Sequence, residues 1–196
     1  KFVVLYEDST LAMNTFGLKF LTHDVWAPNM EEFGALPSIY GTLVSTLIAM
    51  AISTPLAIGI AIFITEVAPG MMKSTIGTMI ELLAAIPSVV YGMWGLFYFV
   101  PVLREFTGDS GIGLLTGGLI LSIMIIPFTA AITRDSMNTT PDILKESAYA
   151  LGGTKWDVIK DVIIPYAQVG IIGSIILALG RAMGETMAVT FVMGNA

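Results

Sequence analysis

The sequence predicts an all-α integral membrane protein, built as a bundle of kinked transmembrane helices. Its composition is the first reason: 55% of the 196 residues are hydrophobic and only 12% are charged, whereas soluble domains carry about 25% charged residues. The second reason is that the apolar residues gather into long stretches with few or no charges, and about 20 such residues cross a bilayer. The net charge of −6 and the lack of cysteine argue against a nucleic-acid surface, a disulfide framework and a thiolate metal site.

Residues 1–37 contain no apolar run of spanning length and are expected to form an extracytoplasmic or interfacial segment. This segment mixes acidic residues with a tryptophan and two prolines, and the single histidine, His23, is expected to be a solvated loop residue. The opening KFVVLYED is too short for a signal peptide and is typical of the end of a preceding helix. The chain also stops directly after an apolar stretch at Met193. We therefore expect a piece that lacks membrane spans at both ends.

Four spans are expected in residues 38–196, the predicted transmembrane domain. They cover about 39–65, 74–100, 112–133 and 162–193, and each contains one proline: Pro55, Pro87, Pro127 and Pro165. Proline is tolerated in membrane helices because neighbouring groups satisfy the carbonyl that it leaves free. Each span is therefore expected to be kinked, either as a simple bend or so that the helices splay around a cavity.

The basic residues of the loops predict the orientation, because cytoplasmic loops are enriched in lysine and arginine. Alternation places 1–37 and 101–111 on one side of the membrane and 66–73 and 134–161 on the other. The first pair holds Lys1, Lys19 and Arg104, and the shorter second pair holds Lys73, Arg134, Lys145, Lys155 and Lys160. The loop 134–161 is therefore expected to lie in the cytoplasm.

This loop predicts two short helices separated by Gly152 and Gly153. Thr140 is expected to cap the first helix, with Pro141 at its first position, and apolar residues follow at helical spacing. Thr154 is expected to cap the second helix after the glycine break. The helices form either a linker at the membrane surface or a docking site for another protein.

The pattern Glu146-Ser147-Ala148, Gly152 and a closing VIIP at Pro165 resembles the EAA loop of type I ABC importer permeases. That motif reads E-A-A, three residues, G, nine residues and I-x-L-P, and its fixed points match the spacing here. Ser147 is one of three conservative departures. The resemblance implies the fold of these permeases, with a cytoplasmic coupling helix that docks into a cleft of an ATPase subunit.

Three further segments narrow the resemblance to the PstC-type permeases of phosphate importers: AIFITEVAP (61–69), IPSVVYGMWGLF (86–97) and GRAMGETMAVTFVMGN (180–195). It implies a multi-pass subunit of a bacterial or archaeal cytoplasmic membrane that is not itself an enzyme. The implied partners are a PstA-like second permease, a PstB-like ATPase dimer and an extracytoplasmic PstS-like phosphate-binding protein. This chain would bind no cofactor, because ATP and Mg²⁺ belong to the ATPase subunits.

Arg181 and Glu185 are the candidate substrate-path residues. A buried arginine in a membrane costs ~2.5–3.5 kcal/mol on insertion scales and usually faces a cavity or protein interior. At a spacing of four the two are expected to share one helix face. A guanidinium matches phosphate oxygens in a bidentate manner, and Glu185 would keep the site weak enough to release the anion. Residues alone leave a structural ion pair equally open, and the resemblance favours the anion path.

Glu81, near the start of the second predicted span, is expected either to reach the cytoplasmic interface or to pair with a cation of another span. Two alternatives for the function stay open. One is an ABC permease for another oxyanion, such as molybdate or sulfate. The other is an ATP-independent channel or carrier in which Arg181 and Glu185 form a gate.

Overall fold

The computed structural model describes residues 34–193 except Asp109, together with residues 4, 6, 9, 10, 16, 17 and 19–25. The chain divides into two compact units, Lys1–Val44 and Ser45–Ala196, which are taken separately. Most of the predicted extracytoplasmic segment 1–37 lies outside the described residues. Its described part includes the short helix α2 (Lys19–Thr22) and His23, which is exposed as expected.

The described chain is helical and contains no strand, which confirms the all-α prediction. Its helices are α3 (Leu36–Ile62), α4 (Gly70–Ala84), α5 (Ser88–Trp94), α6 (Val100–Thr107), α7 (Leu114–Asn138), α8 (Asp142–Ala150), α9 (Lys155–Val158), α10 (Ile164–Met183) and α11 (Met187–Met193). Three π-helical turns continue these helices. η2 (Phe63–Val67) extends α3, η3 (Gly95–Phe99) joins α5 to α6, and η4 (Ile159–Ile163) joins α9 to α10. Three continuous helices are long and apolar enough to cross a membrane: Leu36–Val67, Leu114–Asn138 and Lys155–Met183.

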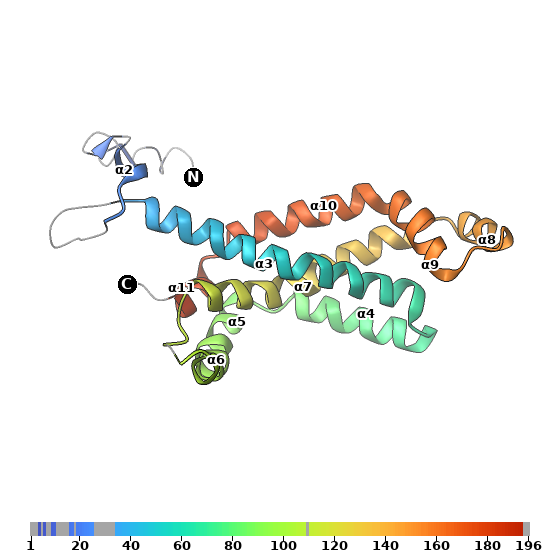
Figure 1. The fold of residues 1–196 in the computed structure, drawn as a ribbon, viewed down its shortest axis with the longest axis horizontal. Coiled ribbons are helices and arrows are strands. Elements are labelled where there is room, and N and C mark those ends of the chain that lie inside the picture. The colour runs from blue at the N-terminus through green and yellow to red at the C-terminus, as the bar shows by residue number, and fades with distance from the viewer. Residues whose placement is uncertain are drawn as a thin grey trace. The chain divides into compact units, whose positions relative to one another are not determined.

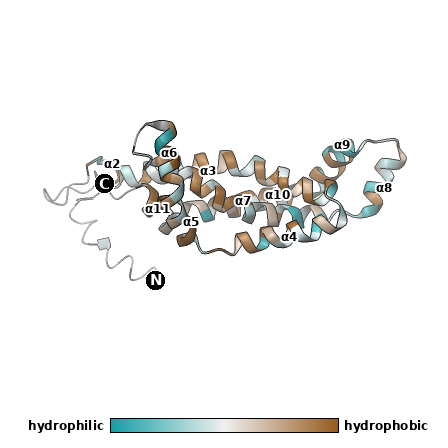
Figure 2. Cartoon of the chain, turned by 90° about the horizontal axis from the view of Figure 1, so that it is seen from below, coloured by the Kyte–Doolittle hydropathy of each residue, from teal (hydrophilic) through white to brown (hydrophobic). Residues whose placement is uncertain are grey.

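Helix α7 is the centre of the second unit, with α4 and α10 packed against it (Figure 1). It is the most buried of the three long helices. A buried hydrogen bond of 2.8 Å between the hydroxyls of Thr133 and Ser174 ties α7 to α10, the kind of polar contact that joins helices in membranes. Figure 2 shows hydrophobic residues along α7 and α10 and hydrophilic residues gathered at α8 and α9.

The second predicted span, 74–100, is not a single helix. Helix α4 and the helical stretch Ser88–Phe106, which begins with α5, meet at an angle of 88°, and the break ends at Pro87. Proline has no N–H to donate to the carbonyl four residues earlier, here that of Leu83. This carbonyl accepts instead from the Tyr91 hydroxyl at 3.0 Å and from the Ile86 N–H at 3.3 Å, so the chain itself supplies the missing donors.

Three other prolines each follow a π-turn. Each described π-turn ends two residues before a proline: η2 before Pro69, η3 before Pro101 and η4 before Pro165. Since the proline ring crowds the carbonyl four residues back and provides no donor, a wider turn ahead of it relieves the crowding without ending the helix. Pro55 and Pro127 instead lie inside α3 and α7 without such a turn.

The fourth predicted span, 162–193, is interrupted. Helix α10 ends at Met183, and α11 begins only at Met187. Helix α11 packs on α5, where Gly92 permits a close approach: a Cβ at this position would lie 2.8 Å from the Cα of Ala188. Of the two candidate substrate-path residues, Arg181 precedes the interruption and Glu185 lies within it.

Candidate functional site: a hairpin and an intramembrane arginine

The predicted helical hairpin is present as α8 and α9. Gly152 ends α8 with a φ of +88°, a conformation that suits glycine, and the Gly153 N–H donates to the Ala148 carbonyl at 3.1 Å, which closes a Schellman-type turn. Thr154 then caps α9 in a capping box with Asp157, each side chain accepting from the other's backbone N–H. The predicted break and the predicted Thr154 cap are confirmed.

The start of the hairpin differs from the prediction. Helix α8 begins at Asp142, and Pro141 rather than Thr140 occupies the capping position, without a side-chain hydrogen bond. The Thr140 hydroxyl is buried and has no hydrogen-bond partner. The expected Thr140 cap was wrong because the extended Pro141 (ψ 136°) stands between this side chain and the first helical N–H groups.

The hairpin carries large apolar side chains that are exposed. Ile143, Leu151 and Trp156 are 70%, 90% and 62% exposed, although they lie in the most polar part of the described chain. Glu146 and Ser147 of the EAA-like pattern are exposed as well, whereas Ala148 is half-buried against the apolar cluster below the hairpin. An exposed apolar surface rimmed by polar residues is typical of a protein-interaction site.

Arg181 lies in the last turn of α10, some 24 Å beyond Pro165 at 1.5 Å per residue. Its guanidinium carbon lies 4.8 Å from the centre of the Phe128 ring of α7. Among the ion pairs of the described residues, none includes Arg181. The cation is therefore held against an aromatic face, a favourable contact, and not by a carboxylate.

Glu185 does not share a helix face with Arg181, which corrects the expectation from their spacing. The helix ends between them, and the Oε1 of Glu185 accepts hydrogen bonds of 3.1 Å from the backbone N–H groups of Met187 and Ala188. The carboxylate thus caps the start of α11, where the helix dipole favours a negative charge. The two residues were expected to form an ion pair or to share one helical face, and in the structure they do neither.

Glu81 pairs with a cation of another helix, one of its two expected roles. Its Oε1 lies 2.7 Å from the Nη2 of Arg134, which also contacts Asp135 at 2.7 Å. Arg134 is largely buried and packs over Gly77, whereas Glu81 is 58% exposed. This cluster joins α4 to the end of α7 and lies apart in sequence from Arg181.

Glu66 is the residue that the sequence analysis missed, because it was included in the predicted turn 66–73. It belongs instead to η2, the last turn of the first long helix, and contacts both helices of the hairpin. An acid at the end of an apolar span followed by a proline was the available signal. Its partners, however, lie 79 and 89 residues further along the chain, a distance that local patterns do not reach.

Comparison with known proteins gives a consistent result. A family model described as "binding-protein-dependent transport system inner membrane component" matches residues 53–196. The chain is 50% identical to the phosphate transport system permease protein PstC of Mesorhizobium japonicum, over 99% of this chain and 65% of the relative, and 51% identical to that of Pasteurella multocida, over 94% and 64%. It is also 41% identical to the probable ABC transporter permease protein YqgH of Bacillus subtilis, over 91% and 59%. The chain thus spans less than two thirds of the length of these relatives.

A solved structure of the MetNI methionine ABC transporter in an inward-facing conformation has a similar fold. The TM-score is 0.59 at 22% identity, over 77% of this chain and 68% of the other. This likeness concerns the fold alone.

Proposed function

Because the chain belongs to the family of binding-protein-dependent transport system inner membrane components, we propose that it is a permease subunit of an ATP-driven importer of inorganic phosphate. The observation that carries this proposal is the 50% identity, over 99% of this chain, to a phosphate transport system permease protein PstC. The long apolar helices supply the membrane-crossing part of such a subunit. The chain is a transport subunit, and ATP is hydrolysed by its partners.

Arg181 is the proposed phosphate contact on the path through the membrane. Its guanidinium can offer a planar fork of N–H donors to two oxygens of the anion. The contact with Phe128 supports this role, because an aromatic face steadies the cation without occupying its donors as a carboxylate would. A site with a single cation binds weakly enough to release the anion, as conduction requires. Glu185 contributes by capping the start of α11, the helix that follows this arginine in the chain.

The hairpin is the proposed docking site for an ATPase subunit. The exposed Ile143 and Leu151 provide an apolar surface for a cleft on that subunit, and the EAA-like residues Glu146, Ser147, Ala148 and Gly152 lie in the same segment. The full assembly comprises a second, PstA-like permease, a PstB-like ATPase dimer carrying ATP and Mg²⁺, and an extracytoplasmic PstS-like phosphate-binding protein. This chain itself binds no cofactor.

Uptake by the complete transporter in proteoliposomes tests this function. With ATP inside and binding protein outside, labelled phosphate is expected to accumulate, and excess unlabelled phosphate is expected to compete far better than molybdate or sulfate. Stronger competition by molybdate or sulfate would assign the subunit to another oxyanion. Equal uptake with and without ATP would instead support a channel or carrier and overturn the proposal.

A further inference from the structure

The last turn of the first long helix has two backbone carbonyls whose usual donors are missing. The carbonyl of Thr65 would accept from the N–H of residue 69, which is a proline. The carbonyl of Glu66 would accept from Gly70, but the helix ends at Val67 and the chain turns extended at Ala68. Buried helix ends need other partners for such groups.

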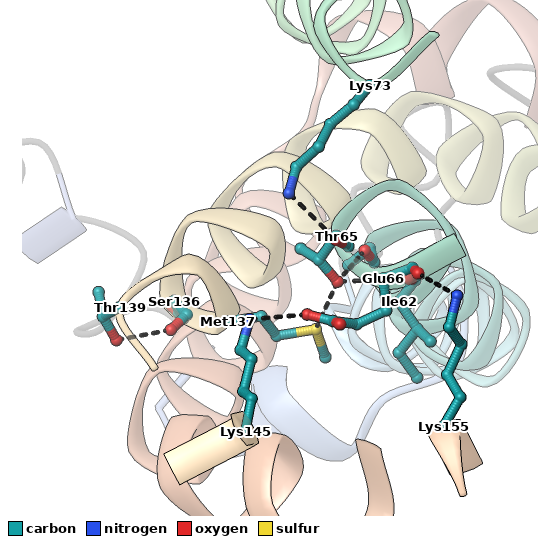
Figure 3. Close-up of polar contacts among 10 residues, drawn as sticks. Ile62, Thr65, Glu66, Lys73, Ser136, Met137, Thr139, Lys145 and Lys155 are labelled. Atoms are coloured by element: carbon teal, nitrogen blue, oxygen red, sulfur yellow. Dashed lines mark hydrogen bonds and ion pairs between the residues drawn. The ribbon is translucent and has the colours of Figure 1, made fainter. Parts of the chain in front are cut away.

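Two lysines from other helices supply these donors (Figure 3). The Nζ of Lys73, from α4, donates to the Thr65 carbonyl at 3.0 Å, and the Nζ of Lys155, from α9, donates to the Glu66 carbonyl at 2.9 Å. Cations are favoured at the C-terminal end of a helix, where the dipole is negative. The end of η2 is therefore completed by α4 and by the hairpin.

A third lysine binds the Glu66 side chain. The Nζ of Lys145, in the middle of α8, lies 2.8 Å from the Oε1 of Glu66, and the two side chains are only 18% and 11% exposed. Exposed ion pairs contribute little, but removing one partner of a buried pair leaves an unpaired charge and is costly. Glu66 thus holds α8 through its carboxylate and α9 through its carbonyl.

An apolar cluster lies beside these polar contacts. Val158, Ile159 and Ile163 of the hairpin helix pack with Ala61 of α3 and with Met137 at the end of α7. All five side chains are almost completely buried, and interiors packed in this way transmit displacement with little compression. The hairpin is linked through the backbone to α7 and α10, whereas its link to α3 consists of this cluster and the lysine contacts.

We propose that Glu66 is a positioning residue that ties the hairpin to the first long helix, so that a displacement of α8 moves α3–η2 as well as α10. The inference rests on the proposed function, in which the hairpin receives movement from an ATPase. The ion pair of Lys145 and Glu66 is the joint, and Lys155 and Lys73 hold the end of η2 in place around it.

The complete transporter in proteoliposomes provides the first test, with phosphate uptake and ATP hydrolysis measured together. Glu66→Gln and Lys145→Gln are each expected to lower the phosphate transported per ATP hydrolysed by about fivefold or more, the lower range of couplings between sites. The double variant is expected to be no worse than the more impaired of the two single variants, because each single substitution already removes the same interaction. Lys160→Gln changes an exposed lysine of η4, the turn that follows the hairpin; it is the matched control and should keep the wild-type ratio.

If Glu66 and Lys145 only stabilised the fold, the variants would reduce the amount of assembled complex without changing the phosphate transported per ATP hydrolysed. An unchanged ratio in both single variants, or losses that multiply in the double variant, would overturn the inference. If the wild-type complex shows no ATP-dependent uptake, it is the proposed function that fails, whereas altered ratios in the variants alone concern the joint. A second measurement follows the joint through a distance and not through transport.

That second measurement uses the lack of cysteine in this chain. Spin labels at Leu144→Cys on α8 and Phe63→Cys on η2, both at exposed positions, report the distance across the joint within the complex. The mean distance is expected to be the same in the ATP-free and the nucleotide-trapped transporter, and to differ between them when Glu66→Gln is added. A wild-type distance that changes with nucleotide would show that α8 and η2 move separately, against the inference.

Discussion

The guanidinium of Arg181 rests on the ring of Phe128, with 4.8 Å between the guanidinium carbon and the ring centre. One residue comes from the last turn of α10 and the other from the middle of α7, so the contact joins two of the three long helices. Cation–π contacts partly compensate a charge but leave the edge of the guanidinium plane available for hydrogen bonds. The contact between the two side chains therefore determines the effects expected from substitutions of Arg181 and Phe128.

Arg181→Ala is expected to abolish ATP-driven phosphate uptake while the complex still assembles. A hydrogen bond to a charged group contributes about 1.5–3 kcal/mol, so the loss of both bonds of a bidentate contact corresponds to about a hundredfold or more. Arg181→Lys should recover only part of the uptake, since an ammonium lacks the planar fork. Uptake and size-exclusion profiles of the purified complex measure both effects, and wild-type uptake by Arg181→Ala would remove this residue from the path.

Phe128→Leu is expected to have a milder effect, because it removes the aromatic face and leaves the arginine. A cation–π contact contributes about 0.5–1 kcal/mol where it is solvated, so the phosphate concentration for half-maximal uptake should rise about two- to fivefold. Phe128→Tyr retains an aromatic face and serves as the control. A Leu variant that matches wild type would indicate that the ring does not position Arg181.

Glu185→Gln should retain uptake and thermal stability. The amide oxygen of glutamine can still accept from the N–H groups of Met187 and Ala188, whereas Glu185→Ala removes the cap and should cost about 0.5–2 kcal/mol. Thermal unfolding of the purified complex compares the two variants. If the charge itself mattered, as in an ion pair with Arg181, the Gln variant would be impaired as severely as the Ala variant.

Thr154→Ala is expected to loosen α9 by about 1 kcal/mol, because it removes both side-chain contacts of the capping box with Asp157. Hydrogen exchange of the backbone amides from residue 155 to residue 158 should become faster, and Thr154→Ser should restore the wild-type rate. Unchanged exchange in the Ala variant would mean that packing of Val158 alone holds this turn.

Gly92→Ala should destabilise the protein, because its Cβ would lie 2.8 Å from the Cα of Ala188 and backbone cannot move aside cheaply. Gly173→Ala in α10 is the matched control, since a Cβ there meets nothing within 4 Å. Alanine is favoured over glycine in a helix by roughly 0.5–1 kcal/mol, so the control should be neutral or stabilising. Equal midpoints of thermal unfolding for the two variants would contradict the close packing of α5 and α11.

The fold class and the hairpin could be predicted from sequence because both depend on local signals. Long uncharged stretches mark the helices, and Gly152 followed by Thr154 marks the break and the new helix start. The bend at Pro87 could not be predicted from the proline alone, because Pro55 and Pro127 lie in continuous helices. The difference depends on tertiary partners such as the Tyr91 hydroxyl at the Leu83 carbonyl.

The candidate site was predicted in part. Arg181 stood out as a charge in an apolar stretch, but a constant helical period placed Glu185 beside it. The sequence Gly184-Glu185-Thr186 carries the signals of a helix end followed by a new helix start, and weighing them would have separated the pair. The role of Glu66 was beyond local reasoning, because it depends on lysines from two other helices, Lys145 of α8 and Lys155 of α9.

The wide turn η4 also affects the orientation of Arg181, which lies at the other end of the same long helix. The helix from Lys155 to Met183 is continuous through 29 residues, with the hairpin at its beginning and Arg181 in its last turn. One additional residue in a turn corresponds to about 100° of rotation at 3.6 residues per turn. The width of η4, which ends two residues before Pro165, therefore sets the side of the helix on which Arg181 emerges. A twist of the helix at the hairpin end would rotate the Arg181 side chain about the helix axis.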